Sequence, residues 1–308
     1  MNATLNSHQP VLLDEVVSAL CARGSGKFLD CTFGGGGHTS AILDHSIDNF
    51  VYAIDRDPEA RKRARILQQK YAGRFAFCGI NFADVGDMCL PTLDGILMDL
   101  GVSSFQLEDG LRGFSFREHA KLDMRMDNFQ GRTAAEFLDT ASESELVQAI
   151  RDFGEERNWK KIVSLVIENR GKDALIYGDS FANLIAANVR GARNARIHPA
   201  TKTFQGVRIA VNGELDALEK ALPSLFGKLC QGGRLVVISF HSLEDRIVKR
   251  FFKKMAGQAV SFADIRPSQF REKFANIVTT RPIVPGKSEI EFNPRSRSAK
   301  MRVLEKIK

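Results

Sequence analysis

The chain has 308 residues, a net charge of +7 and a hydrophobic share of 44%. That length accommodates one large domain or two smaller ones, and this hydrophobic share is enough for a packed core, so we expect a globular protein. No stretch approaches the roughly 20 apolar residues of a membrane span, and residues 1–10 lack the charged and apolar regions of a signal peptide, so we expect a cytoplasmic protein with no membrane partner. The five cysteines contain no C-x-x-C pair and the six histidines no ligand pair, so we predict neither a disulfide framework nor a bound metal.

The first hundred residues alternate between helical and extended patterns. In chain order they predict a helix over 11–20, a strand at 28–30, a strand at 50–54, a helix from 57 to 69, a strand at 74–78 and an apolar strand at 95–98. Asp99 ends the last strand. Alternation of this kind predicts an α/β fold with a mostly parallel, doubly wound sheet, whose ligand lies beyond the carboxyl ends of the strands.

A glycine run marks the loop after the first predicted strand. Glycines occupy positions 34–37, and Asp55 ends the next strand. Glycine permits positive φ and a close approach of the backbone to a ligand, and an acid at the end of the second strand faces ribose hydroxyls. A dinucleotide fingerprint would need a third glycine where the chain has Thr39 and Ser40. The pattern therefore favours S-adenosylmethionine (AdoMet), which carries no pyrophosphate, over NAD; the alternative is a plain tight turn.

The middle of the chain interrupts the alternation. Residues 101–128 are irregular, and helices follow. The expected helices begin at capping boxes at Thr133 and Ser142, at Trp159 with an end at Gly171, and at Ser180 with an end at Gly191. We therefore expect an all-helical domain at 106–205, inserted into a domain formed by 1–105 and 206–308.

The α/β pattern resumes in the last third of the chain. It predicts a helix over 203–222, a strand at 235–238, a helix through Lys254 that starts at a capping box of Ser242 and Asp245, and a last strand at 300–305.

Chemistry is expected where the glycine loop, Asp55 and Asp99 meet at the strand ends. Methyl transfer from a sulfonium mainly requires alignment of donor and acceptor and exclusion of water. An exocyclic base amine also needs a hydrogen-bond acceptor on its N–H, for which Asp99 and Ser103 are the catalytic candidates, with Ser104 as a further hydroxyl. The alternative is that Asp99 caps the turn and binds cofactor while the serines hydrogen-bond locally, and cofactor binding is the favoured role for Asp99.

Two basic segments lie apart in the sequence. Residues 190–208 contain five Lys or Arg and no acid, and residues 281–308 contain eight against three Glu. Such segments suit a polyanion such as RNA, although a charge run is also common on an ordinary solvated face.

Eight longer motifs occur in a fixed order: Thr32–His38, Ala53–Pro58, Asp99–Ser104, Arg112–Phe116, Leu122–Asp127, His198–Gln205, Ser239–Arg246 and Asn293–Lys300. Together they resemble the bacterial ribosomal RNA small subunit methyltransferase H family over nearly the whole chain. The resemblance implies a class I AdoMet-dependent methyltransferase fold, Rossmann-like, whose inserted helical domain recognises substrate. It also implies methylation of N4 of a cytidine in 16S rRNA at the decoding centre, on an assembled small ribosomal subunit.

Matched motif to motif, the resemblance implies cofactor contacts at Gly36, Gly37, His38, Asp55, Phe82, Asp99 and Gln106. The alternative for Phe82 is a core side chain, and for His38 a residue that only begins a helix. Residues 117–121 depart from the family, as do Gly206 and Gly213, which stand within a predicted helix where each costs about 1 kcal/mol relative to alanine. The oligomeric state stays open, a homodimer included. Rival hypotheses are an RNA-binding assembly factor without chemistry and a nicotinamide-dependent oxidoreductase.

Overall fold

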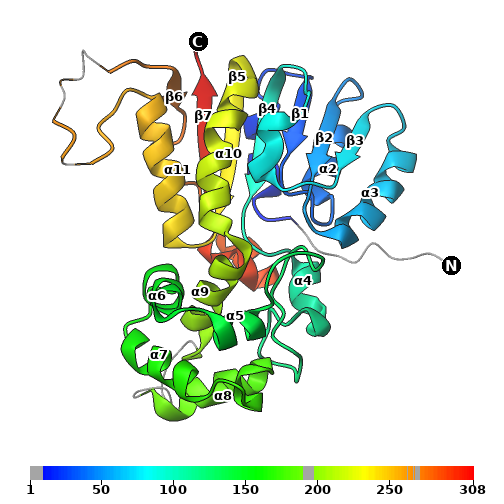
Figure 1. The fold of residues 1–308 in the computed structure, drawn as a ribbon. Helices are drawn as coiled ribbons and strands as arrows, with labels where there is room; N and C mark the ends of the chain where they lie inside the picture. The colour runs from blue at the N-terminus through cyan, green and yellow to red at the C-terminus, as the bar shows by residue number, and fades with distance from the viewer. Residues whose placement is uncertain (1–9, 190–197, 262, 266, 268–270) are drawn as a thin grey trace. The chain divides into compact units, whose positions relative to one another are not determined.

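The computed structural model describes residues 10–189, 198–261, 263–265, 267 and 271–308. The chain divides into two compact units (Figure 1). Unit 1 comprises Met1–Gly101 and Leu215–Lys308, and unit 2 comprises Val102–Glu214. Within the described ranges, no helix combines the length and the apolar character that crossing a bilayer requires.

A sheet forms the centre of unit 1. Its strands within the described residues are β1 Lys27–Asp30, β2 Phe50–Ile54, β3 Phe75–Cys78, β4 Leu93–Asp99, β5 Leu229–Ser239, β6 Ala275–Ile277 and β7 Lys300–Lys306, in the order β3-β2-β1-β4-β5-β7-β6. The first five pair in parallel, and β7 runs antiparallel to both of its neighbours. The mostly parallel α/β sheet is therefore confirmed. The strand order reverses between β1 and β4, and a ligand site is expected at the carboxyl ends of these two strands.

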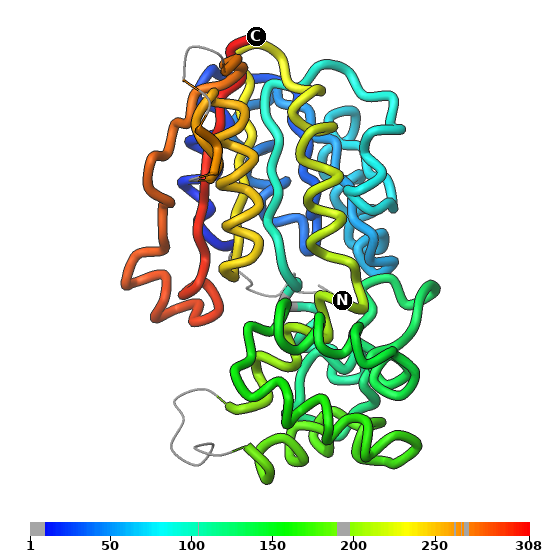
Figure 2. Tube along the Cα trace, turned by 60° about the vertical axis from the view of Figure 1, so that its left-hand side comes forward, coloured from blue at the N-terminus to red at the C-terminus, as the bar shows by residue number. Residues whose placement is uncertain are grey.

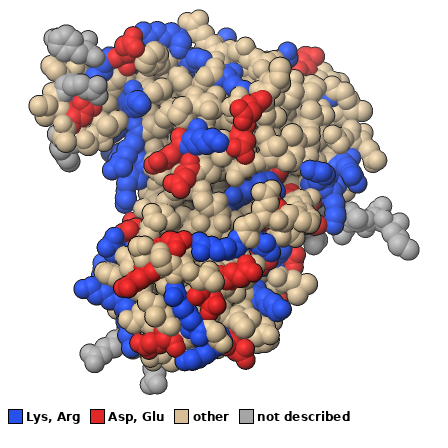
Figure 3. Space-filling view, viewed as in Figure 1, with Lys and Arg blue, Asp and Glu red and all other residues tan. Residues whose placement is uncertain are grey.

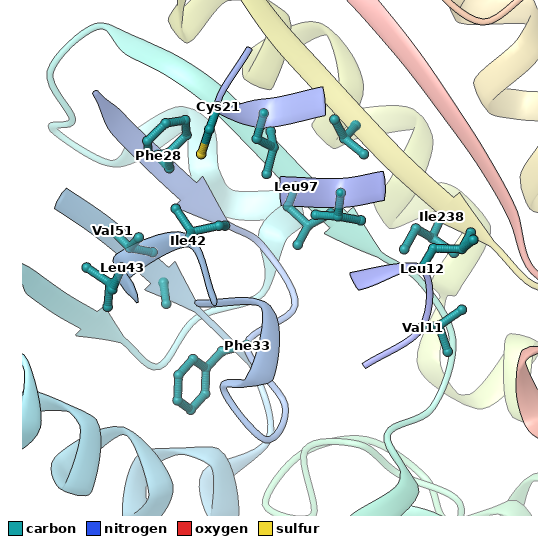
Figure 4. Close-up of a cluster of buried hydrophobic side chains, with 14 of the residues drawn as sticks. Val11, Leu12, Cys21, Phe28, Phe33, Ile42, Leu43, Val51, Leu97 and Ile238 are labelled. Carbon is teal, nitrogen blue, oxygen red and sulfur yellow. The ribbon is translucent and has the colours of Figure 1, made fainter. Parts of the chain in front are cut away.

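Helices cover both faces of the sheet (Figures 1 and 2). Helices α1 (Leu13–Leu20), α2 (Gly37–His45) and α3 (Pro58–Lys70) pack on one face, and α10 (Glu214–Lys228) and α11 (Ser242–Met255) pack on the other. Two hydrophobic clusters lie one on each face of the sheet. Successive side chains of a strand point to opposite faces, so Leu97 of β4 belongs to the first cluster and its neighbours Ile96 and Met98 belong to the second. Figure 4 shows the first cluster, where Phe28 lies near Ile42. A short helix, α12 (Lys287–Phe292), precedes β7.

Local sequence signals explain where the helix after β2 begins. Asp57 is the N-cap of α3, and its side chain accepts a hydrogen bond from the Glu59 N–H at 3.0 Å. Pro58 occupies the first turn, where its missing N–H costs nothing. This start is confirmed as predicted.

Among the described residues of unit 2, the regular secondary structure is helical, with one isolated bridge between Lys121 and Tyr177 and an irregular stretch between Gly113 and Thr133. Its α-helices are α4 Ser104–Glu108, α5 Ala134–Thr140, α6 Glu143–Val147, α7 Trp159–Glu168, α8 Gly178–Asn188 and α9 Thr201–Asn212, and a π-helical turn, η3, spans Gln148–Phe153. The predicted capping boxes at Thr133 and Ser142 are both present. A separate core cluster that includes Leu138, Ile162 and Phe181 holds α5 to α9 and η3 together.

The prediction of one helix over 203–222 is wrong. Gly213 adopts a left-handed φ of 58° and ends α9, so that α10 begins as a new helix at Glu214. Gly206 lies inside α9, as predicted. Glycine is needed there because a Cβ would lie 2.0 Å from the backbone oxygen of Ala149 in η3. Both glycines that looked unfavourable in the sequence thus have a structural reason.

Two predicted caps are also wrong. Ser180 lies inside α8, whose N-cap is Tyr177, because the bridge to Lys121 already fixes the chain there; the end expected at Gly191 lies outside the described residues. The capping box of α11 is formed by His241 and Glu244, one residue earlier than the predicted pair.

Candidate functional site at the carboxyl ends of β1, β2 and β4

The loop between β1 and α2 carries the glycine run. Gly34 and Gly36 have φ values of 51° and 78°, in the left-handed region that favours glycine. A Cβ on Gly36 would lie 2.8 Å from the ring of Phe33, and one on Gly37 would lie 2.3 Å from Pro10 Cγ. Packing within the chain therefore requires glycine at positions 36 and 37, whether or not a ligand also approaches the backbone there.

Asp55 lies directly after β2 and is held against this loop. Its Oδ2 accepts the Gly34 N–H at 2.7 Å and its Oδ1 accepts the Asp57 N–H at 2.8 Å. Burial raises the pKa of Asp55, and these two amide donors oppose that rise. A carboxylate oxygen has two lone pairs, so each oxygen keeps one for the hydroxyls of a ribose.

Asp30, the last residue of β1, is a second buried acid. It is 1% exposed, and it accepts hydrogen bonds from the Thr32 N–H at 3.0 Å and from Thr39 Oγ1 at 2.7 Å. Burial raises its pKa to about 6, and the charge of Asp55 adds to the rise. Thr32 Oγ1 also accepts the Asp99 N–H at 2.7 Å, so the loop ties the end of β1 to the end of β4.

Asp99 ends β4 and is the least satisfied acid of this group. Its Oδ1 is buried and accepts no hydrogen bond from the described residues, while its Oδ2 lies 3.7 Å from His38 Nδ1. Burial, followed by the charges of Asp30 and Glu244, raises the pKa of Asp99 well above its usual range. A buried acceptor without a donor is destabilising by about 1–3 kcal/mol, so a ligand that brings an N–H or a positive charge to this point gains that energy.

His38, in the first turn of α2, is buried and lies between two partners. Its Nε2 is 3.0 Å from the Val11 oxygen, and its Nδ1 faces Asp99. With the proton on Nε2, which donates to Val11, Nδ1 is an acceptor for a protonated Asp99. The structure thus places His38 beside Asp99, and a direct contact with a cofactor stays a prediction.

Phe82 begins a short 3-10 helix, Phe82–Asp87, after β3. Asn81 caps this helix by accepting the Ala83 N–H at 3.0 Å. The Phe82 side chain is half-buried and packs against the second core cluster. It is therefore partly a core residue, and its role as a wall for adenine stays a prediction.

Ser103 and Gln106 belong to unit 2 and form a capping box at the start of α4. Ser103 Oγ accepts the Gln106 N–H at 3.2 Å, and Gln106 Oε1 accepts the Ser103 N–H at 2.9 Å. The pattern Ser-x-x-Gln is a capping-box signal that the sequence analysis overlooked. The arrangement bears out the local hydrogen bonding that was the alternative for Ser103, and its catalytic role stays a prediction.

Sequence reasoning also missed the part played by Asp30, Thr32 and Thr39. Asp30 was visible at the start of the glycine motif, but the pattern did not show that two threonines would satisfy it. Thr39 was considered only as the residue that replaces a fingerprint glycine. Its hydroxyl points to Asp30 because α2 begins directly after the loop and turns Thr39 inward, where it is fully buried.

The site therefore gathers acidic side chains at the strand ends: the charge of Asp55 raises the pKa of Asp30, and the charges of Asp30 and of Glu244, in the first turn of α11, raise that of Asp99. Like charges that are buried together raise one another's pKa, and a cation bound beside them relieves the repulsion. AdoMet carries a sulfonium and an ammonium group, whereas a nicotinamide dinucleotide carries an anionic pyrophosphate. The donor set of unit 1 therefore fits AdoMet.

Comparison with known proteins finds a matching family model, relatives of similar length and solved structures. The model of the MraW methylase family matches residues 5–307. A protein of Granulibacter bethesdensis named ribosomal RNA small subunit methyltransferase H is 42% identical, over 99% of this chain and 92% of its own length. One of the same name from Thermomicrobium roseum is 44% identical, over 98% of this chain and 94% of its own. The solved structure of an rRNA methylase from Streptococcus thermophilus aligns with 98% of this chain and 100% of its own, at 9% identity and a TM-score of 0.41.

Proposed function

This chain belongs to the MraW methylase family, and we propose that it transfers a methyl group from AdoMet to the exocyclic N4 of a cytidine in 16S rRNA. The acceptor is at the decoding centre, within the small ribosomal subunit, and a cytoplasmic location is part of the same proposal. The family match over residues 5–307 and the shared name of its relatives support the reaction class. The observation from the structure that carries the proposal is that the buried Oδ1 of Asp99 accepts no hydrogen bond from the described residues, while other carboxyl groups raise the pKa of Asp99.

In this proposal the residues that hold AdoMet in unit 1 are Gly36, Gly37, His38, Asp55, Phe82 and Asp99. Asp55 is braced by two backbone N–H groups and binds the ribose hydroxyls. Phe82 supplies an apolar surface for the adenine. Gln106 of unit 2 stays a cofactor contact on the strength of the resemblance alone.

When bound, AdoMet supplies an electrophilic methyl on a sulfonium that leaves as a neutral thioether. The N4 atom would form the new N–C bond as the carbon–sulfur bond of the donor breaks, and the proton that N4 loses would pass to the Asp99 carboxylate. Asp99 accepts a hydrogen bond from N4–H through its free oxygen, and His38 keeps the carboxyl oriented from the other side. Ser103 is the second candidate for this acceptor role.

The test is methyl transfer with radiolabelled AdoMet to small ribosomal subunits from cells that lack the enzyme, followed by nucleoside analysis. We expect labelled N4-methylcytidine. A protein that binds these subunits but leaves them unlabelled would be the assembly factor, and one that binds NADH in a fluorescence titration would be the oxidoreductase.

Asp55→Ala is the variant that separates an enzyme from a binding protein. Removal of the braced carboxylate should weaken AdoMet binding by about 2 kcal/mol, because hydrogen bonds to a charged group are worth about 1.5–3 kcal/mol. Asp48→Ala, which removes an exposed carboxylate in the turn before β2, is the matched control. Calorimetry with AdoMet should find the loss for Asp55→Ala alone, and equal affinities for the two variants would contradict the assignment.

A further inference from the structure

A pocket outside the acidic site lies in unit 1, between the second half of α11 and the edge strand β6. Its volume is about 360 Å³, and its floor is apolar, with Phe252, Ala256 and Ile277. Small-ligand sites have volumes of about 300–1,000 Å³, so the space accommodates a group of nucleotide size. Phe252 is 1% exposed, so its ring closes the floor and offers no free face for stacking on a base.

Cations line the walls of this α11–β6 pocket. Lys249, Lys253, Lys273 and Arg302 contribute, and no Asp or Glu is among the lining residues. Arg302 is neutralised, since its Nε donates to Asp245 Oδ1 at 2.6 Å and its Nη2 to Oδ2 at 3.2 Å. In the part of the chain that the structure describes, no carboxylate forms an ion pair with any of the three lysines. The positive charges of the three lysines are therefore not neutralised within the pocket, and they lie next to the neutral polar side chains of Asn276 and Thr280.

The pocket is bounded by fixed backbone. At the end of α11, Gly257 has a φ of 67°, and the Gln258 N–H donates to the Lys253 oxygen at 2.8 Å. The Phe274 N–H donates to the Met255 oxygen at 2.8 Å and ties the start of β6 to the helix. A preformed site of this kind binds with less loss of conformational entropy than a mobile one.

More Lys and Arg continue along α11, as Figure 3 shows on this face. At 3.6 residues per turn, Arg250 and Lys254 stand beside Lys249 and Lys253 on the outer side of the helix, but neither lines the pocket. Since α11 starts at the carboxyl edge of the sheet and rises 1.5 Å per residue, Lys249 and Lys253 lie about 10–16 Å along the helix from that edge. The pocket is therefore separate from the acidic site.

We propose that the α11–β6 pocket binds a backbone phosphate of the RNA substrate, away from the site that holds the reacting nucleotide. This inference rests on the proposed function, because it takes the substrate to be RNA. Lysine side chains, an amide and a hydroxyl are the groups that contact phosphate and sugar oxygens, and they position a strand without reading its sequence. An acidic protein segment has the same sign of charge but is the less suited occupant, because the substrate in the proposed function is itself a polyanion that carries one phosphate per nucleotide.

The test compares two double variants on the same helix, K249Q/K253Q in the pocket and R250Q/K254Q beside it. Both remove two positive charges, and glutamine keeps a helix propensity close to that of lysine. Binding of a labelled small-subunit rRNA fragment is measured over a series of salt concentrations. The pocket variant should bind about fivefold to tenfold more weakly, and its plot of log Kd against log salt should be shallower by about 0.7, the value for one phosphate contact on a single strand.

The control variant should keep the affinity and slope of the wild type, and both variants should keep its affinity for AdoMet, which shows that they fold. A second measurement needs no mutation: the lysines of the wild type are acetylated with and without RNA, and the modified residues are identified by mass spectrometry. Bound RNA should reduce acetylation of Lys249 and Lys253 more than that of Lys254. Equal losses in the two variants, or unchanged binding in both, would overturn the pocket assignment. Absence of methyl transfer by the wild type would instead overturn the proposed function, since the binding data are obtained without turnover.

Discussion

The substitution Asp30→Asn tests the electrostatic description of the site most directly. Asp30 is almost fully buried, and its two oxygens each accept one hydrogen bond, from Thr32 and from Thr39. Asparagine has the same shape and keeps the bond from the Thr32 N–H, while its amide donates to Thr39 Oγ1 once that hydroxyl rotates. The substitution therefore removes the ionisation of Asp30 with little change in packing.

The magnitude follows from the pKa. Burial raises the pKa of Asp30 from 3.8 to about 6, a difference of about 2.2 pH units, which corresponds to about 3 kcal/mol at 1.36 kcal/mol per unit. Because the folded protein has the higher pKa, the neutral acid favours folding: its contribution is fully present below pH 3.8 and is lost as the pH rises through about 6. Slightly less than half, about 1.4 kcal/mol, is lost between pH 5 and pH 8.

The assay is urea denaturation of the wild type and of Asp30→Asn at pH 5 and at pH 8. The difference between the two proteins should change by about 1.4 kcal/mol or more in favour of the variant over that interval. Titrating groups that do not interact with Asp30 cancel in the comparison, and loss of the Asp30 charge also reduces the rise in the pKa of Asp99, which acts in the same direction. Asp48→Asn, an exposed acid of the same unit, is the control and should parallel the wild type. Parallel stability curves for Asp30→Asn and the wild type would refute the claim that Asp30 is strained by burial.

Other predictions concern the ligand and the glycines. AdoMet affinity should rise as the pH rises through about 6, because a bound cation favours the ionised forms of Asp30 and Asp99, whose pKa values are raised in the free protein; calorimetry in buffers of different ionisation enthalpy should detect proton release, and heats that do not depend on the buffer would contradict this. Gly213→Ala should destabilise the protein by about 1 kcal/mol and Gly213→Asn by less, because only the left-handed φ is strained and no atom lies within 4 Å of the new Cβ. Gly206→Ala should cost about 3 kcal/mol or more, since its Cβ would meet the Ala149 oxygen at 2.0 Å; similar melting temperatures for the two alanine variants would show that this packing argument is wrong.

The strands and most helices of unit 1 were predictable because each is marked by local chemistry. A short apolar run that ends in Asp55 or Asp99 is typical of a buried strand with a polar end, and Asp57 with Pro58 is a typical N-cap and first-turn pair of a helix. Strand β6 was not predictable. It has three residues, Ala275–Ile277, and it exists because it pairs with β7, which lies more than twenty residues further along the chain.

The break at Gly213 shows the opposite limit. A single glycine within a helical pattern is compatible with a helix interior and with a helix end, and the sequence does not distinguish the two. Gly206 and Gly213 are seven residues apart, and the structure uses one for close helix packing and the other for a left-handed turn. The difference comes from η3, which packs against α9 near Gly206 and has no counterpart near Gly213.

The acids of the site were predictable as positions but not as a coupled group. Parallel strands bring their carboxyl ends together, so Asp55 and Asp99 were expected to converge from the strand pattern alone. The raised pKa values depend on burial and on distances between Asp30, Asp99 and Glu244, which come from strands and a helix far apart in the chain. Thr32 and Thr39 contribute only through the hydrogen bonds that the loop geometry allows.

Unit 1 has carboxyl groups at the strand ends and lysines on α11, and the two sets of charges have different roles in the proposed methyl transfer. A cationic methyl donor is stabilised by buried carboxyls, whose field is little screened by salt because water is excluded around them. A polyanionic acceptor is attracted by exposed lysines, whose effect falls steeply with salt because bound counterions are released. If the acids were exposed, they would repel the RNA; if the lysines lay among the acids, they would pair with them and lose their attraction for phosphate. Burial of the acids beneath the β1–α2 loop and exposure of the lysines on α11 keep the two apart, which explains how a chain of net charge +7 can hold an acidic site.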